Sequence, residues 1–300
     1  MPDFRKVFVM KDLRQITVIG LGLLGGSITL AAGRSLPDVK TVGYTHRAST
    51  RRKARRLAVA SEIADDIRQS VSGADLVILA TPISTFEKIF CEIRGSLSKG
   101  CIVTDVGSTK VQVHRWAARQ LPKSVRYVGS HPIAGSEQRG LEFARDDLFE
   151  RADCILTATK STDRKAVRTL WRFWAMLGCS VKVMTPDEHD RIFARVSHVP
   201  HVLAAALINA NDSETLKFAG KGFMDTTRIA SGPANIWADV LMTNAANSVR
   251  GIDRVIRELV KIKRIIKNGD NRSIEKLLEA ARNKRRALIE YKMRRKELIT

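Results

Sequence analysis

The stretch "QITVIGLGLLGGS", residues 15–27, decides the fold. Its glycines follow the order G-x-G-x-x-G, a pattern that is common by chance and needs structural context. "QITVI" has the composition of a buried strand, and "LLGGSITLAAGR" is small and apolar enough to form a helix packed directly on a sheet. Between them, Gly20 permits a tight turn, Gly22 lets a pyrophosphate approach the backbone, and Gly25 permits close packing of helix on strand. We therefore predict a dinucleotide-binding loop.

Strand and helix patterns alternate along the first 184 residues. "ADLVILATP" is a continuous apolar run typical of a central parallel strand, and further strands are predicted at "CIVTDVGS", "VRYVGSHP", "DCILTAT" and "SVKVMT". Repeated βαβ units imply a parallel sheet with helices on both faces. The fold class predicted for residues 1–184 is thus α/β, with a Rossmann-type doubly wound parallel sheet.

The pattern changes after Pro186, where only helical periodicity continues. We expect several helices, with breaks at "GKGFMD", "SGPAN" and "KNGDN". Helical arrays beside nucleotide-binding sheets often supply a dimer interface and one wall of an active site. Residues 185–300 are therefore predicted to form an all-α domain for substrate binding and dimerisation.

Composition excludes several classes of protein. Hydrophobic residues make up 44% of the chain, which excludes a mostly disordered protein, and no apolar run approaches the roughly 18 residues that a membrane span needs. The first 15 residues lack the apolar core of a secretory signal, so we expect a cytosolic protein without membrane attachment. The four cysteines are scattered, without a C-x-x-C pair or a neighbouring histidine, so we expect reduced thiols and no metal site.

The net charge of +21 is the unusual feature of the composition. Residues 250–300 alone hold 17 basic and 7 acidic side chains. Such a balance favours an anionic partner: nucleic acid, anionic lipid or a small acidic substrate drawn in by the field. A solvated basic helical surface accounts for the charge of this tail as well, and we do not expect nucleic-acid binding.

The end of the second strand, "DVKTVGYT", bears on the choice of coenzyme. An Asp or Glu at this place would hold the ribose 2′-hydroxyl of NAD, but here Thr45, His46 and Arg47 follow, with Arg51 and Arg52 one turn further on. Arginines suit a 2′-phosphate, so NADP is preferred and NAD is the alternative, because these arginines can also simply solvate a helix. The predicted coenzyme-binding residues are Gly20, Leu21, Gly22, Leu23, Leu24, Gly25, Thr45, His46, Arg47, Thr81 and Pro82.

Hydride transfer to a nicotinamide needs a base near the carbon that loses the hydride. "TDVGSTK" places Ser108 and Lys110 just after a strand, at the edge where open α/β sheets bind ligands. "GSHPIAGSE" places His131 at the same edge one unit later. A histidine between a strand and Pro132 is poorly placed for a routine core residue, so His131 is a candidate base.

Five motifs occur together and in order: "GLGLLGGS", "TDVGSTK", "GSHPIAGSE", "DEHDRIFARVSHVPH" and "GFMDTTRIA". With them the chain resembles the prephenate dehydrogenase family, which includes the arogenate and cyclohexadienyl dehydrogenases of tyrosine biosynthesis. The likeness spans about residues 15–240 and leaves the basic tail largely uninformed. It implies oxidative decarboxylation of prephenate to 4-hydroxyphenylpyruvate with hydride transfer to NAD(P), with arogenate as the alternative substrate, and a homodimer formed through the helical domain.

The resemblance also implies roles for single residues. His131 matches the catalytic histidine that accepts a hydrogen bond or proton from the ring hydroxyl, and Ser108 matches the serine that helps to hold that hydroxyl. Arg228 matches the arginine that binds the substrate carboxylate, so the site should lie between the two domains. His201 matches a substrate-side histidine of prephenate-using members, which tilts the prediction toward prephenate.

Other positions are less informative. Ser136 and Glu137 match a loop at the mouth of the family's site, and Trp237 matches an aromatic residue near the substrate or the dimer interface. His198 stands three residues from His201 on one helix face, but no third metal ligand is evident, and we interpret His198 and His189 as packed core histidines.

The chain departs from the family in "IASGPANIW", where the proline comes one residue early and puts the role of Trp237 in doubt. We expect no chorismate mutase segment before the glycine loop and no tyrosine-binding regulatory module after the helices.

Two other functions remain open at this level. The first is a nucleic-acid or anionic-surface binder with a redox-sensing NADP module, which leaves the joint occurrence of His131, Ser108, His201 and Arg228 without a reason. The second is an NADP-dependent reductase of a hydroxy acid or imine with the same two-domain plan. It would turn over without releasing CO2.

Overall fold

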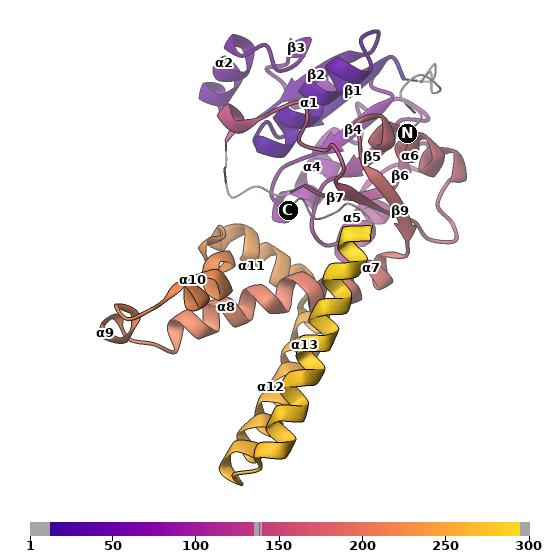
Figure 1. The fold of residues 1–300 in the computed structure, drawn as a ribbon. Coiled ribbons are helices and arrows are strands. Elements are labelled where there is room, and N and C mark those ends of the chain that lie inside the picture. The colour runs from indigo at the N-terminus through magenta and orange to yellow at the C-terminus, as the bar shows by residue number, and fades with distance from the viewer. Residues whose placement is uncertain (1–12, 135–137, 139, 295–300) are drawn as a thin grey trace. The chain divides into compact units, whose positions relative to one another are not determined.

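The structure is a computed structural model and describes residues 13–134, 138 and 140–294. The chain divides into two compact units, Met1–Asn244 and Ala245–Thr300. The first unit holds all strands of the described residues, together with the helices up to residue 243, and the second holds two long helices (Figure 1). The domain boundary expected near residue 185 stays a prediction.

A six-stranded sheet in the order β3-β2-β1-β4-β5-β6 forms the centre of the first unit. All five strand pairs are parallel, as the βαβ pattern predicts. The chain moves outward from β1 to β3 and then returns to the other side of β1, so the strand order reverses between β1 and β4, where open α/β sheets bind ligands. The strands are β1 (Gln15–Ile19), β2 (Lys40–Tyr44), β3 (Glu62–Ile63), β4 (Leu76–Leu79), β5 (Ile102–Asp105) and β6 (Arg126–Tyr127).

Both faces of this sheet are buried, each in its own core cluster. Successive side chains of each strand point to opposite faces and so join different clusters. Ile16 and Ile78 join a core cluster with α1 and α6, whereas Ile19 and Val77 join a second cluster with α3, α4 and α5. The helices of the first half are α1 (Leu23–Ser35), α2 (Ala48–Arg56), α3 (Ile67–Val71), η2 (Ile83–Thr85), α4 (Phe86–Ile93), α5 (Val111–Gln120), η3 (Leu141–Phe143) and α6 (Arg164–Met176).

The segment "VRYVGSHP" forms two strands instead of the single strand expected from its pattern. β6 ends at Tyr127, and β7 (Gly129–Ile133) begins a second sheet in the order β7-β8-β9. β7 runs antiparallel to β8 (Asp153–Thr157), which is parallel to β9 (Ser180–Met184). Thr104 and Ser130 still link β5 to β7, with 2.7 Å between their hydroxyl oxygens, so His131 follows a residue anchored to the main sheet.

Short helices follow β9 and complete the first unit. They are α7 (Pro186–Phe193), the π-helical turn η4 (Ala194–His198), α8 (Val199–Asn209), α9 (Ser213–Leu216), α10 (Lys221–Thr227), η5 (Arg228–Ser231) and α11 (Ala234–Thr243). A break separates α9 from α10 at residues 217–220, so it overlaps the expected "GKGFMD" at Gly220, and α10 begins at Lys221. The break at "SGPAN" is present, since Gly232 and Pro233 separate η5 from α11.

The continuous helical stretch Pro186–Asn209 is long and apolar enough to cross a membrane by length and composition alone. Core helices of soluble proteins pass the same test. This stretch carries His189, Asp190, His198 and His201, all buried within the first unit. Other apolar side chains of the stretch, among them Val196 and Leu207, are exposed. Absence of membrane attachment and a cytosolic location stay predictions.

The second unit is a hairpin of α12 (Ala245–Lys267) and α13 (Asn271–Arg294), joined by a turn at Gly269 (Figure 1). Gly269 has φ of +64°, a conformation that favours glycine, and the turn lies at the predicted break "KNGDN". Several large apolar side chains of both helices are exposed, among them Ile256, Leu259 and Leu278. Two packed helices of this kind leave apolar surface available to a partner.

Candidate functional site

The glycine loop between β1 and α1 is shaped by close backbone approach. Gly20 has φ of +103°, and a Cβ atom there would lie 2.6 Å from the Ala80 backbone, so only glycine fits this turn. A Cβ atom on Gly25 would lie 1.8 Å from the carbonyl oxygen of Gly20, which makes Gly25 a packing residue. Gly22 differs, because a Cβ atom there meets nothing within 4 Å. The space beside Gly22 is open to a ligand.

Two cavities meet at this loop. Cavity 1, about 860 Å³, runs from the glycine loop to α11, and cavity 2, about 700 Å³, lies between the glycine loop and the end of β2. Of the predicted site residues, cavity 1 is lined by Gly22, Leu23, Leu24, Thr81, Pro82, Ser108 and Arg228, and cavity 2 by Gly20, Leu21, Gly22, Thr45, His46, Arg47, Thr81 and Pro82. Gly22, Thr81 and Pro82 belong to both, so the two cavities adjoin at these residues and are together called the groove.

Other predicted residues do not line the groove. Gly25 packs inside the loop, and His131 and His201 are not among the residues that line either cavity. Ser136 and Glu137 lie outside the described residues.

The groove fits a dinucleotide by its own geometry. The first backbone N–H groups of α1, as of any helix, have no intrahelical acceptors. Because the N-cap residue Gly22 has no side chain to accept from them, they are open to an anion. Gly22 supplies the room that a pyrophosphate would fill. Leu23, Leu24 and Gly25 carry those N–H groups, which gives a chemical reason for their place in the predicted set.

The arginines near cavity 2 divide into two kinds. Arg47 is exposed and lines the cavity. Arg51 instead donates to the carbonyl oxygens of Thr45 and His46, at 2.8 and 3.0 Å, and to Asp65 at 3.0 Å. Arg51 therefore supports the loop after β2, and Arg47 is the arginine placed to meet a ligand.

A buried ion pair shapes the loop that carries Ser108. Lys110 and Asp105 are both fully buried; the Lys110 Nζ donates to Asp105 and, at 2.6 Å, to the carbonyl oxygen of Ser130. Asp105 also accepts from the Gly107 N–H at 2.7 Å and from the Tyr127 hydroxyl at 2.6 Å. A buried pair survives only with such additional hydrogen bonds, because both charges lose hydration. The pair fixes the turn that presents Ser108 to cavity 1.

His131 lies on β7 within a cluster of rings. Its Nδ1 is 2.9 Å from Nε2 of His189, and the ring centroid of Phe193 is 4.9 Å away. Burial, reinforced by His189 and Lys110, holds the pKa of His131 well below its usual value of 6.5. A neutral imidazole is therefore the form present at pH 7, and this is the form that a general base requires.

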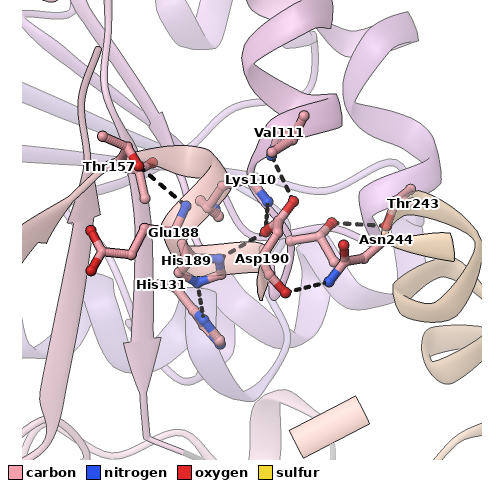
Figure 2. A network of polar contacts seen from close by, with 12 residues as sticks. Lys110, Val111, His131, Thr157, Glu188, His189, Asp190, Thr243 and Asn244 are labelled. Atoms are coloured by element: carbon pink, nitrogen blue, oxygen red, sulfur yellow. Dashed lines mark hydrogen bonds and ion pairs between the residues drawn. The ribbon is translucent and has the colours of Figure 1, made fainter. Parts of the chain in front are cut away.

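His189 connects His131 to a buried carboxylate (Figure 2). The Nδ1 of His189 lies 2.8 Å from Asp190 Oδ1, and burial lowers the pKa of His189 to about 2. Asp190 also accepts from the N–H groups of Lys110 and Val111, at 2.8 and 2.9 Å, where α5 begins. The interpretation of His189 as an ordinary packed core histidine missed this contact.

The helical side of cavity 1 is formed by η5 and α11. Arg228 lines it at the start of η5, and the ring of Trp237 stacks on His201 with 3.6 Å between centroids and 12° between planes. His201 is buried, its pKa is lowered by that burial, and its buried Nδ1 has no hydrogen-bond partner within the described residues. Trp237 therefore belongs to this wall despite the early proline.

Asp239 was missed by the sequence reasoning. Its Oδ2 accepts from the Ser84 N–H at 3.1 Å and ties α11 to the loop after β4 that carries Thr81 and Pro82. The hydroxyls of Thr243 and Thr109, 2.8 Å apart, tie the same helix to the Ser108 loop. The only signal in the sequence was polar residues spaced four apart on an otherwise apolar helix.

Among residues 13–134, 138 and 140–294, no group of three or more His, Cys, Asp or Glu side chains is placed to hold a metal.

The sheet with its reversal point, the glycine loop and the adjoining cavities define a Rossmann-type nucleotide-binding protein with a helical second part. The family description "Prephenate dehydrogenase, nucleotide-binding domain" matches residues 28–183, and "Prephenate dehydrogenase, dimerization domain" matches residues 185–280. The chain belongs to the prephenate dehydrogenase family.

Relatives and solved structures agree with this assignment. A prephenate dehydrogenase of Bacillus subtilis strain 168 is 35% identical over 286 residues, covering 93% of this chain and 76% of that protein. A crystal structure of prephenate dehydrogenase from Aquifex aeolicus, in complex with hydroxyphenyl propionate and NAD+, is 32% identical, covers 92% of this chain and 98% of that one, and superposes with a TM-score of 0.86. The crystal structure of Synechocystis arogenate dehydrogenase is 28% identical, covers 91% and 99%, and has a TM-score of 0.80.

Proposed function

We propose that this chain catalyses the oxidative decarboxylation of prephenate to 4-hydroxyphenylpyruvate, a step of tyrosine biosynthesis, with NAD(P)+ as hydride acceptor. The observation that carries the proposal is the groove that joins the open space at Gly22 to Ser108 and Arg228. The bound nicotinamide would accept the hydride from the ring carbon that bears the hydroxyl. The bond from the ring to its carboxylate breaks, CO2 leaves, and the electron pair completes the aromatic ring.

His131 is proposed as the base. The hydroxyl of the reacting carbon gains acidity as the hydride leaves, and a neutral His131 accepts its proton or hydrogen bond. A positioned base of this kind contributes roughly 100- to 10,000-fold in rate. Ser108, on the loop fixed by the Lys110–Asp105 pair, is proposed to hold the same hydroxyl beside His131.

Substrate binding is assigned to the helical wall of cavity 1. Arg228 offers a planar fork that suits a carboxylate, and His201 stacks on Trp237, which lines the same wall. Ser136 and Glu137 are kept as proposed residues of the cavity mouth. Prephenate carries a keto group where arogenate carries an amino group, and we propose prephenate as the main substrate because His201 is present, with arogenate as the alternative.

For the coenzyme we propose a preference for NADP over NAD. Support comes from Arg47 and Lys53 at cavity 2 and from the neutral Thr45 at the end of β2, where an acid would bind the ribose of NAD. Lys53 also pairs with Glu142 at 2.8 Å, so Arg47 carries most of the argument. The Aquifex protein binds NAD+, and NAD is therefore the alternative to be tested.

We also propose that the chain folds as two domains, residues 1–184 and 185–300, and forms a homodimer through the helical one. The match of residues 185–280 to a dimerization domain and the exposed apolar side chains of α12 and α13 support this assembly. The basic tail is then part of, or beside, a protein interface, and nucleic-acid binding is not proposed.

The test is nicotinamide reduction, followed by absorbance, in four mixtures of prephenate or arogenate with NAD or NADP. Release of CO2 is measured in parallel, because an NADP-dependent reductase of another small acid would not decarboxylate its substrate. Turnover with prephenate and CO2 release supports the proposal, and the four rates rank both substrates and both coenzymes. Absence of turnover in all four mixtures, with coenzyme still bound, would overturn it.

A further inference from the structure

The proposed base, His131, is the first of three side chains joined by hydrogen bonds, and His189 and Asp190 are the other two. Figure 2 shows His189 between His131 and Asp190, with both of its ring nitrogens engaged. The nitrogen–nitrogen distance to His131 is 2.9 Å and the nitrogen–oxygen distance to Asp190 is 2.8 Å. Both distances are within the range of ordinary hydrogen bonds, so each contact needs one proton and one lone pair.

The end of the line at Asp190 sets the direction of every hydrogen bond in it. Asp190 Oδ1 already accepts from the Lys110 N–H, and its Oδ2 accepts from the Val111 N–H. Burial raises the pKa of Asp190, and the two backbone N–H groups at the N-terminus of α5 oppose that rise. Both of its oxygens accept from these groups, which favours the ionised, accepting carboxylate. His189 must therefore donate from Nδ1, and because burial keeps it neutral its Nε2 carries a lone pair. His131 then has to donate from Nδ1 to His189.

This direction of the hydrogen bonds determines whether the second ring nitrogen of His131, Nε2, carries a proton. A neutral imidazole carries one proton, and in His131 the acceptor on His189 holds that proton on Nδ1. The Nε2 atom is left with the lone pair that a base needs. With the opposite tautomer, the same ring would present an N–H to the substrate hydroxyl and could not accept its proton.

The line is anchored at several points, so it is rigid. The Asn244 amide donates to the Asp190 carbonyl at 2.8 Å and lies 3.3 Å from His198 Nδ1. The ring of Phe193 stacks on His189 with 4.4 Å between centroids. Asp190 thereby joins α7 to the start of α5, and the orientation of His189 follows from that packing.

We propose that Asp190 and His189 are positioning residues that hold His131 in the tautomer with the proton on Nδ1 and the lone pair on Nε2. The inference rests on the proposed role of His131 as the base. It gives a role to His189 and Asp190, two buried polar residues that have no other part in the proposed reaction. Neither residue touches substrate or coenzyme in this scheme.

The matched variants are His189→Gln and His189→Leu. The glutamine Oε1 can accept from His131 Nδ1 while its amide group donates to Asp190, whereas leucine of similar volume can do neither. We expect His189→Leu to lower kcat at least about 10-fold relative to His189→Gln, as residues that orient a ligating histidine do. The KM values for substrate and coenzyme should stay within about 2-fold of each other in the two variants, because the inference places no contact with either.

Asp190→Asn tests the direction of the line. An asparagine with its amide nitrogen toward His189 would donate to His189 Nδ1, reverse both tautomers and place a proton on His131 Nε2. The loss in kcat is then expected to be roughly 100- to 10,000-fold, the range that a positioned general base contributes, and a wrong histidine tautomer is known to cost about 10,000-fold. Circular dichroism and thermal unfolding identify variants that simply fail to fold.

Nitrogen NMR of the protein with labelled histidine gives a readout that needs no turnover. At pH 7 the wild type should show His131 with a protonated, pyrrole-like Nδ1 and an unprotonated, pyridine-like Nε2, assigned by loss of the signals in His131→Asn. A protonated Nε2 in the wild type, or equal kcat in the glutamine and leucine variants, would overturn the inference. If the tautomer is as expected but no substrate is turned over, the proposed function fails and the inference about the tautomer stands.

Discussion

The indole of Trp237 lies flat on the imidazole of His201, with 3.6 Å between ring centroids and 12° between planes. Gly232 closes the space around this pair, because a Cβ atom there would lie 2.3 Å from the indole nitrogen and 3.1 Å from His201 Cε1. Gly232 has φ of −61°, so an alanine meets no backbone strain and acts only through this collision. The pair and the glycine together set the shape of the helical wall of cavity 1.

Gly232→Ala is expected to displace the Trp237 ring and weaken substrate binding. A stacked aromatic pair is worth about 0.5–1.5 kcal/mol, so the KM for prephenate should rise roughly 2- to 10-fold while the KM for coenzyme changes little. Gly222→Ala is the matched control, since a Cβ atom on Gly222 meets nothing within 4 Å. Steady-state kinetics of both variants check the prediction, and an unchanged KM in Gly232→Ala would contradict it.

The glycine loop allows structural and ligand-binding roles to be separated. Gly22→Ala meets open space in the protein, so its free energy of unfolding should stay within about 0.5 kcal/mol of wild type while coenzyme affinity falls at least about 10-fold. Gly25→Ala collides with the Gly20 carbonyl and should destabilise the fold itself. Gly33→Ala, in the same helix with open space around it, is the control for helix propensity. Urea unfolding and coenzyme titration measure the two effects, and normal coenzyme binding by Gly22→Ala would rule out a pyrophosphate there.

The sequence predicted the parts of this molecule that local pattern controls. The glycine loop, the apolar β4 and the change to helices after β9 all follow from residue spacing and hydrophobic period. The separate antiparallel strand β7 was not predictable, because "VRYVGSHP" reads as one strand until Val128 is seen to break it. Its antiparallel pairing with β8 depends on tertiary contacts, which local sequence pattern does not reveal.

The site shows the same limit. His131 and Ser108 could be named because each directly follows a strand pattern. His189 and Asp190 are far from both in sequence, and only the packing of α7 against α5 brings them to His131. Lys110 was noted for its position, but its complete burial with Asp105 could not be read from a single charged letter in a polar loop.

Arg47→Ala tests the coenzyme preference. If Arg47 binds a 2′-phosphate, removing a charge-assisted hydrogen bond worth about 1.5–3 kcal/mol should raise the KM for NADP roughly 10- to 100-fold. The KM for NAD should change less than about 2-fold, because NAD has no phosphate at that position. Arg52→Ala is the control, because Arg52 is an exposed arginine of α2, the helix that Arg47 precedes, and does not line cavity 2. Equal changes for both coenzymes would assign Arg47 to general electrostatics instead of 2′-phosphate recognition.

Buried neutral histidines should make stability fall in mild acid. Burial, followed by the charge of Lys110, lowers the pKa of His114 to about 4, and burial lowers that of His198 to about 4 as well. Below pH 6.5 the unfolded chain therefore binds protons that the folded chain does not, so the free energy of unfolding decreases as pH falls from about 6.5 to about 4. Each histidine contributes roughly 3 kcal/mol over that window.

His114→Gln isolates one of these contributions. The glutamine can still reach the Thr157 hydroxyl, which lies 2.9 Å from His114 Nε2, but it does not titrate. Urea unfolding of wild type and variant at pH 7.5, 6, 5 and 4 should show a flatter pH dependence in the variant, with the difference growing to about 3 kcal/mol at the acid end. The value at pH 7.5 gives the direct cost of the substitution and is subtracted. A variant whose stability falls as steeply as that of the wild type would show that His114 takes up its proton in the folded protein as readily as in the unfolded chain.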